Sequence, residues 1–111
     1  MINYQYCKRF SALLLFLVSA NSSAHYPILH CHFINNDNQS LVECSAGFSD
    51  RSIAANVVME VYSENDELIS AGKTDEAAIY RFEPSSEIFF IIMDAGPGHV
   101  IEISDEDVVR Q

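Results

Sequence analysis

The residues of this chain with the clearest chemical potential are its four histidines, and His25 is the most informative of them. Cleavage of a secretory signal peptide after Ala24 makes His25 the N-terminal residue, with a free α-amine beside its imidazole. The amine and a ring nitrogen together chelate a divalent ion such as nickel, cobalt or copper. Protons compete for both nitrogens, so we expect such a site to lose affinity on acidification.

His99 becomes a candidate ligand in combination with His25. It follows the turn sequence Gly96-Pro97-Gly98, which is expected to hold its imidazole near the surface at the start of a strand. The first and last strands of a small sandwich can lie close in space, and this would bring the two rings together. On its own, His99 is equally well explained as a structural residue.

His30 and His32 are weaker metal candidates. They lie two residues apart, so in a strand both point to the same face and can reach one ion. However, Glu43 is expected opposite His32, where the two side chains form an ordinary cross-strand pair. We favour this pair over a second metal site.

The first 24 residues have the three parts of an export signal. Lys8 and Arg9 form its positive region, residues 12–18 its apolar region, and residues 22–24 a cleavage site of small residues. The apolar run is short for a transmembrane helix, which takes about 20 apolar residues. Cleavage after Ala20 and retention as an uncleaved anchor are the alternatives, and neither leaves a free amine next to the imidazole.

Removal of residues 1–24 leaves residues 25–111, which we expect to be a single small domain in the periplasm. The removed segment contains two basic residues and no acidic one, so four basic side chains remain against sixteen acidic ones. The formal net charge is then −12 with neutral histidines. This charge argues against nucleic acid as a partner. A negative charge attracts cations, but an acidic surface also keeps a protein soluble. The net charge alone does not show which of these two roles it has here.

Cys31 and Cys44 are the two cysteines of the expected mature chain, and their spacing predicts a disulfide. A two-residue turn at 37–38 pairs Asn36 with Gln39, and the antiparallel register then places the cysteines opposite each other. Counting from the turn makes them a non-hydrogen-bonded pair, in which side chains come closest. An oxidising compartment favours the disulfide over the alternative of two thiolates that bind a soft metal.

Short β-rich runs separated by turn residues predict an all-β fold. We expect a small antiparallel sandwich of about seven strands, immunoglobulin-like or transthyretin-like. The expected strands are 26–34, 40–48, 56–62, 67–71, 78–82, 88–93 and 99–103. Alternation in the first two strands assigns six residues to the core: Leu29, Cys31, Phe33, Val42, Cys44 and Ala46.

The run 88–93 is apolar on both faces. A central strand that is buried on both sides explains this pattern, and so does a strand whose second face covers a partner protein. The sequence leaves both explanations open.

Six segments of the chain together carry a family resemblance: residues 24–25 (AH), 46–50 (AGFSD), 57–62 (VVMEVY), 72–76 (GKTDE), 80–82 (YRF) and 94–99 (DAGPGH). With them, residues 24 to about 107 resemble the small periplasmic accessory proteins of nickel and cobalt uptake systems, which have a carboxypeptidase-regulatory-like, transthyretin-type sandwich. The last segment, with its Gly-His ending, is the most specific. Several of the others occur throughout this sandwich class and indicate the fold rather than the function.

The resemblance implies a metal-related role for His25 and His99, which fall on the family's histidine positions. It also implies a membrane permease as partner, and the apolar run 88–93 then offers a contact surface for it. The chain departs from the family pattern at Arg51 and Ala78, where glycine is usual. We expect these two residues to tighten or reshape their loops, because they tolerate a positive φ less well than glycine.

The leading hypothesis is a non-enzymatic periplasmic protein that assists nickel or cobalt uptake, by binding the ion or by organising a permease. No Ser-His-Asp or paired-carboxylate spacing singles out an enzyme. One alternative is a copper-binding or copper-delivery protein, because an N-terminal histidine on a β-sandwich also suits Cu(II). The other is a structural or adhesive module without a metal function.

Overall fold

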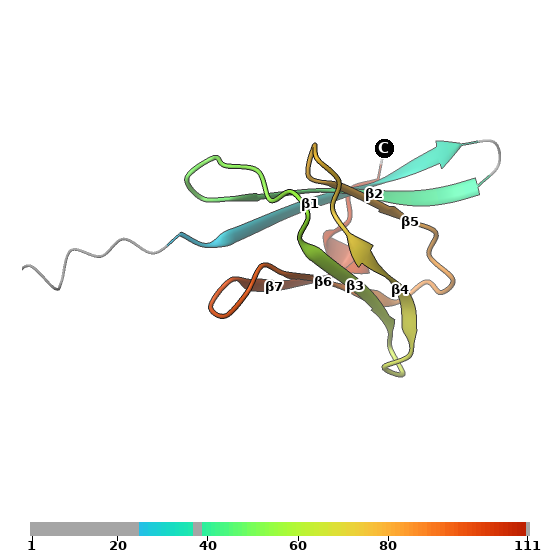
Figure 1. Ribbon diagram of the computed structural model, residues 1–111. Helices are drawn as coiled ribbons and strands as arrows, with labels where there is room; N and C mark the ends of the chain where they lie inside the picture. The colour runs from blue at the N-terminus through green and yellow to red at the C-terminus, as the bar shows by residue number, and fades with distance from the viewer. Residues whose placement is uncertain (1–24, 37–38, 111) are drawn as a thin grey trace, which may run out of the picture.

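The computed structural model describes residues 25–36 and 39–110 and shows a sandwich of two antiparallel sheets (Figure 1). The first sheet contains β1 (Pro27–Asn36), β2 (Gln39–Phe48) and β5 (Ile79–Phe82), side by side in that order. The second contains, in spatial order, β4 (Leu68–Lys73), β3 (Val58–Ser63), β6 (Phe89–Asp94) and β7 (Val100–Ser104). A single 3-10 turn, η1 (Asp105–Asp107), follows β7. The predicted all-β sandwich of seven strands is confirmed.

The predicted signal peptide, with its cleavage site at Ala24, lies outside the described residues, as do the turn residues 37–38. Within the described part of the chain, no helix is long and apolar enough to cross a membrane.

The register of the first hairpin is the predicted one. Asn36 pairs with Gln39, and Cys31 pairs with Cys44. The two cysteines form a disulfide, and their Cα atoms lie 4.0 Å apart, in keeping with the close spacing of a non-hydrogen-bonded pair. With both sulfurs in this bond, they are not thiolates available to a soft metal.

The core lies between the two sheets and includes the predicted residues of the first hairpin. Five of these six side chains are buried, and Phe33 is half-buried at the end of the sandwich, beneath the guanidinium of Arg110. The facing sheet contributes five fully buried side chains: Met59, Val61, Phe89, Ile91 and Met93. Edge-to-face packing of Phe82 on Phe89 joins the two layers, with ring centroids 5.6 Å apart.

β6 is a central strand whose two faces differ in burial. Phe89, Ile91 and Met93 point into the core, whereas Phe90 and Ile92 are half-buried on the outer face of the sheet. Neighbouring strands cover the outer residues only in part. The central position of β6 therefore explains why its inner face is apolar. That a partner protein covers its outer face stays a prediction.

Two loop residues have the backbone conformation that glycine favours. Arg51 has a φ of 74° and Ala78 a φ of 63°. Each closes a turn by a backbone hydrogen bond: Arg51 donates to Phe48 O, and Ala78 donates to Asp75 O. The two loops thus keep a left-handed turn residue without a glycine, at a cost in backbone strain.

The chain after η1 adds to the first sheet, which the sequence did not predict. Val109 pairs in parallel with His32 beside β1, and its N–H donates to Cys31 O. Elsewhere the predicted strand ends lie within two residues of the observed ones. β3, for example, begins after Asn56, whose φ of 57° is incompatible with a strand.

Candidate metal site

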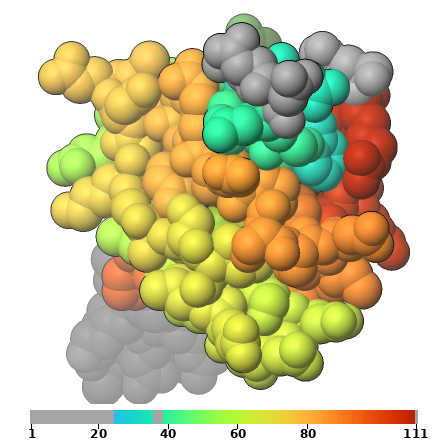
Figure 2. Space-filling view, turned by 90° about the vertical axis from the view of Figure 1, so that its right-hand side faces the viewer, coloured from blue at the N-terminus to red at the C-terminus, as the bar shows by residue number. Residues whose placement is uncertain are grey.

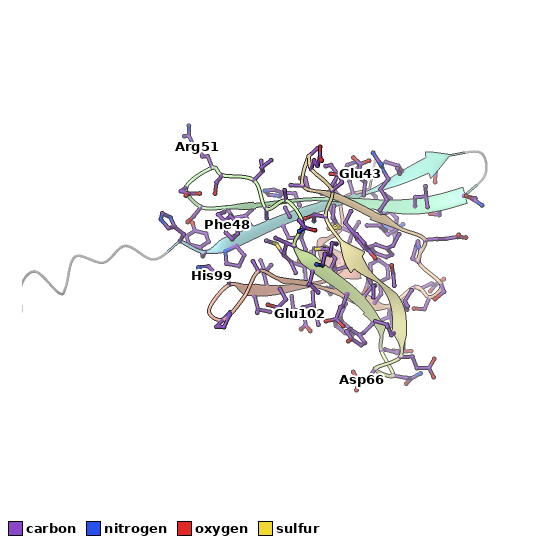
Figure 3. All side chains as sticks on the ribbon, in the orientation of Figure 1. Glu43, Phe48, Arg51, Asp66, His99 and Glu102 are labelled. Carbon is purple, nitrogen blue, oxygen red and sulfur yellow. A yellow bond between two sulfur atoms is a disulfide. The ribbon has the colours of Figure 1, made fainter. Side chains whose placement is uncertain are left out.

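The two principal metal candidates, His25 and His99, lie at the same end of the sandwich and line one pocket. The pocket has a volume of about 250 Å³ and is bounded by His25, Phe48, Asp50, Ser52, Ala95 and His99. His25 comes from the segment before β1, and His99 from the turn between β6 and β7. Figure 3 shows Phe48 and His99 together at this end. The predicted proximity of the first and last strands therefore holds for these two residues.

The turn before β7 holds the ring of His99 in place. Gly96 and Gly98 have φ angles of 109° and 79°, which only glycine adopts readily, and Ala95 and His99 close the turn by a backbone hydrogen bond of 2.9 Å. The Nδ1 atom of His99 lies 3.1 Å from Pro97 O. A carbonyl only accepts, so a hydrogen bond here needs the proton on Nδ1, and in that tautomer of the neutral ring Nε2 is the nitrogen with a lone pair for a ligand.

A second contact fixes the same ring. Phe48 packs edge-to-face on His99, with ring centroids 6.1 Å apart and an interplanar angle of 87°. Phe48 is the last residue of β2, so the hairpin itself positions the histidine.

The start of the described chain is anchored to the loop after β2. Tyr26 N donates to Ser49 Oγ, and Ser49 N donates to Tyr26 O, which extends the pairing of β1 with β2 by one step. His25 is thereby held beside Asp50, with 3.8 Å between His25 Nδ1 and Asp50 Oδ2. His25 itself is about half-exposed at 53% of its side-chain area, so a ligand can reach the imidazole from solvent.

Ser52 orients the carboxylate of Asp50. The hydroxyl and the backbone N–H of Ser52 both donate to Asp50 Oδ1, at 2.6 Å and 3.0 Å. These two hydrogen bonds are the main reason why the pKa of Asp50 lies below its ordinary value, and the nearby His25 lowers that pKa further. Asp50 is therefore an anion at neutral pH. Sequence reasoning did not select it as a site residue, although it belongs to the AGFSD segment.

The side chains around this pocket do not form a finished metal centre. Across residues 25–36 and 39–110, no three His, Cys, Asp or Glu side chains are gathered closely enough to hold an ion. The pocket offers two imidazoles and one carboxylate on its walls. Cleavage after Ala24, which stays a prediction, would add the α-amine of His25 as a further donor.

His30 and His32 lie away from this pocket, on the outer face of the first sheet. His32 Nε2 is 3.6 Å from Glu43 Oε1, and Glu43 also accepts a hydrogen bond of 2.7 Å from Arg81 Nε. His30 is exposed opposite Ser45. The favoured cross-strand pair is confirmed, and the structure does not place these two histidines with His25 and His99.

A larger hollow of about 690 Å³ lies at the opposite end of the sandwich. Its walls come from the end of the first hairpin, the segment between β5 and β6, and the C-terminal residues, which adjoin one another in Figure 2. The described residues that line it include Phe33, Ser86, Glu87, Asp105 and Arg110, and none of the described ones is a histidine or cysteine. They therefore offer no imidazole or thiolate ligand for a transition metal.

No family model, no curated protein and no solved structure matches this chain. The structure shows a small all-β sandwich in which His25 and His99 line one pocket.

Proposed function

We propose that this protein is an exported, non-enzymatic sandwich that binds a divalent transition metal at its N-terminal end and assists the uptake of nickel or cobalt. The observation that carries the proposal is the shared pocket: His25 and His99, from opposite ends of the chain, line the same small hollow. Imidazole is the usual protein ligand for nickel, cobalt, zinc and copper.

The donor set depends on maturation. Cleavage after Ala24 frees the amine of His25, which then binds an ion together with its own ring. His99 adds a third nitrogen through Nε2, which its contact with Pro97 leaves available. The proposed donor set therefore includes one nitrogen that is not a side-chain atom, since the His, Cys, Asp and Glu side chains of residues 25–36 and 39–110 do not form a group of three by themselves.

The role in uptake and the permease partner rest on the resemblance to accessory proteins of nickel and cobalt transport. The outer face of the second sheet is the surface open to such a partner. Val58 and Val100 are 39% and 54% exposed there on either side of Asp94, and Glu60 and Glu102 flank the half-buried Ile92. A partner on this face would therefore meet acidic as well as apolar side chains. In this arrangement the metal pocket stays free at one end of the sandwich.

The test is a calorimetric titration of the mature protein, its N-terminus verified by mass, with Ni²⁺, Co²⁺ and Cu²⁺. The double variant His25→Ala, His99→Ala is expected to bind Ni²⁺ and Co²⁺ at least about tenfold more weakly, a loss of about 1.4 kcal/mol or more. The matched control is His30→Ala, His32→Ala, which removes two histidines from the outer sheet face and is expected to bind like the wild type.

Equal binding by the wild type and the His25, His99 variant would overturn the proposal, as would the absence of binding in the wild type. Cu²⁺ binds most nitrogen sites more tightly than Ni²⁺, so tight Cu²⁺ binding alone is expected. A site that binds Cu²⁺ but neither Ni²⁺ nor Co²⁺ at micromolar concentration would instead mark a copper protein.

A further inference from the structure

The outer face of the second sheet places acidic side chains next to apolar ones. Glu60 of β3 and Glu102 of β7 lie on either side of Ile92, which pairs with both of them from β6. The hydroxyl of Tyr62 donates to Glu60 Oε2 at 2.7 Å, and this contact orients the half-buried carboxylate. Figure 3 shows Glu102 on the side of the molecule away from Glu43 of the first sheet. The two glutamates thus flank one apolar side chain on a face that the first sheet does not cover.

A third carboxylate, that of Asp94, occupies the next outward position of β6, between Val58 and Val100. Within residues 25–36 and 39–110, none of the three carboxylates on this face forms an ion pair. Lys73, opposite Val58 in β4, is the one basic residue in the strands of the second sheet. The face therefore has more negative than positive charge of its own.

This combination of side chains restricts what can cover the face. A purely apolar partner would leave carboxylates desolvated and unpaired, which is strongly unfavourable. A second copy of the chain, docked by the same face, would add three more carboxylates and only one more lysine. Nucleic acid and anionic lipid would be repelled. A partner that complements the face has to bring both apolar side chains and cations.

We infer that the outer face of the second sheet binds a basic surface of a partner protein, on which two Lys or Arg side chains flank an apolar one. The two cations stand about 10 Å apart, because Glu60 and Glu102 are two strand spacings of about 4.8 Å from each other. A helix provides this spacing, since residues i and i+7 lie about 10.5 Å apart along its axis with i+3 and i+4 between them on the same side. The inference rests on the proposed function only for the presence of a partner, and it adds the chemistry of that partner.

The probe is a helical peptide with Lys at i and i+7, Leu at i+3 and i+4, and one Trp. The protein contains no Trp, so the fluorescence anisotropy of the peptide reports its binding. A second peptide has Glu in place of each Lys. We expect the wild-type protein to bind the Lys peptide at least about tenfold more tightly than the Glu peptide, and added salt to weaken this binding.

The variant Glu60→Gln, Glu102→Gln locates the binding. Glutamine keeps the size of each side chain and an oxygen that accepts from Tyr62, but it removes the charge. We expect this variant to bind the Lys peptide at least about tenfold more weakly than the wild type does. The matched control is Glu76→Gln, Glu83→Gln, which removes the same charge from two exposed residues outside the second sheet and is expected to bind like the wild type.

Equal losses in the two variants would overturn the inference, because the effect would then be one of net charge. No binding of the Lys peptide to the wild type, or equal binding of the two peptides, would overturn it as well. A Ni²⁺ titration of the Glu60, Glu102 variant keeps this test apart from the proposed metal site. The variant retains His25 and His99, so we expect it to bind Ni²⁺ like the wild type whether or not the peptide binds.

Discussion

The residues around the proposed metal pocket show how neighbouring side chains orient its candidate ligands. Pro97 and Phe48 fix the ring of His99, and Ser52 fixes the carboxylate of Asp50. Supporting contacts of this kind keep ligands close to their binding orientation, so that less freedom is lost when an ion binds. His25 has the least support of the three, because its ring is half-exposed.

Arg51 provides a residue-scale prediction about stability. Its φ of 74° costs a side-chain residue about 1–2 kcal/mol, whereas glycine adopts this conformation readily. Glycine also raises the entropy of the unfolded chain, which offsets about 0.5–1 kcal/mol of that gain. We expect Arg51→Gly to stabilise the protein by about 0.5–1 kcal/mol in urea unfolding.

The comparison for Arg51→Gly is Arg51→Ala, which removes the charge but keeps a Cβ atom. Alanine is expected to give no such increase, because its strain at positive φ is like that of arginine. A similar increase in the free energy of unfolding in both variants would show that the charge of Arg51, and not the strain at its positive φ, lowers the stability of the protein.

Among the elements, the hairpin of β1 and β2 carries the disulfide and one wall of the pocket. The disulfide closes a loop of 13 residues in sequence, and its removal frees the unfolded chain. We expect Cys31→Ala, Cys44→Ala to lower the free energy of unfolding by about 3 kcal/mol. Urea unfolding of the oxidised wild type, the reduced wild type and the variant provides the measurement. A variant as stable as the oxidised wild type would contradict this role of the disulfide.

The same hairpin shows which parts of the fold are readable from sequence. Its register follows from a two-residue turn and strict alternation, which are local, so the Cys31–Cys44 pairing could be counted out from the turn. The pairing of Val109 with β1 joins parts of the chain that are far apart in sequence, so no local sequence pattern predicts it. Asp50, by contrast, was within reach of the same count, because continuing this register past Tyr26 and Ser49 sets it opposite His25.

The two faces of β6 show a further limit of sequence reasoning. Alternation correctly separated Phe89, Ile91 and Met93 from Phe90 and Ile92, because side-chain direction has a strict period of two. How far the neighbouring strands cover the outer pair depends on their side chains and on the twist of the sheet. The sequence therefore predicts on which face of β6 each side chain lies, but it does not predict how exposed the outer side chains are.

In the molecule as a whole, the proposed metal pocket and the larger hollow lie at opposite ends of the sandwich, with the disulfide-linked hairpin running between them. The strongly acidic composition gives the molecule a net negative charge, which attracts cations and is screened by salt. These features are the ones on which the proposal of a small accessory domain with a cation site at one end rests.

The most direct test of the account compares two forms of the protein: one begins at His25, and the other begins at Asn21, the product of cleavage after Ala20. Both contain every side chain of the pocket, and they differ in whether the α-amine belongs to His25. If the amine is a ligand, Ni²⁺ is expected to bind the His25 form at least about tenfold more tightly in a calorimetric titration. Equal affinities would contradict the central claim that this N-terminus, together with His99, forms the metal site.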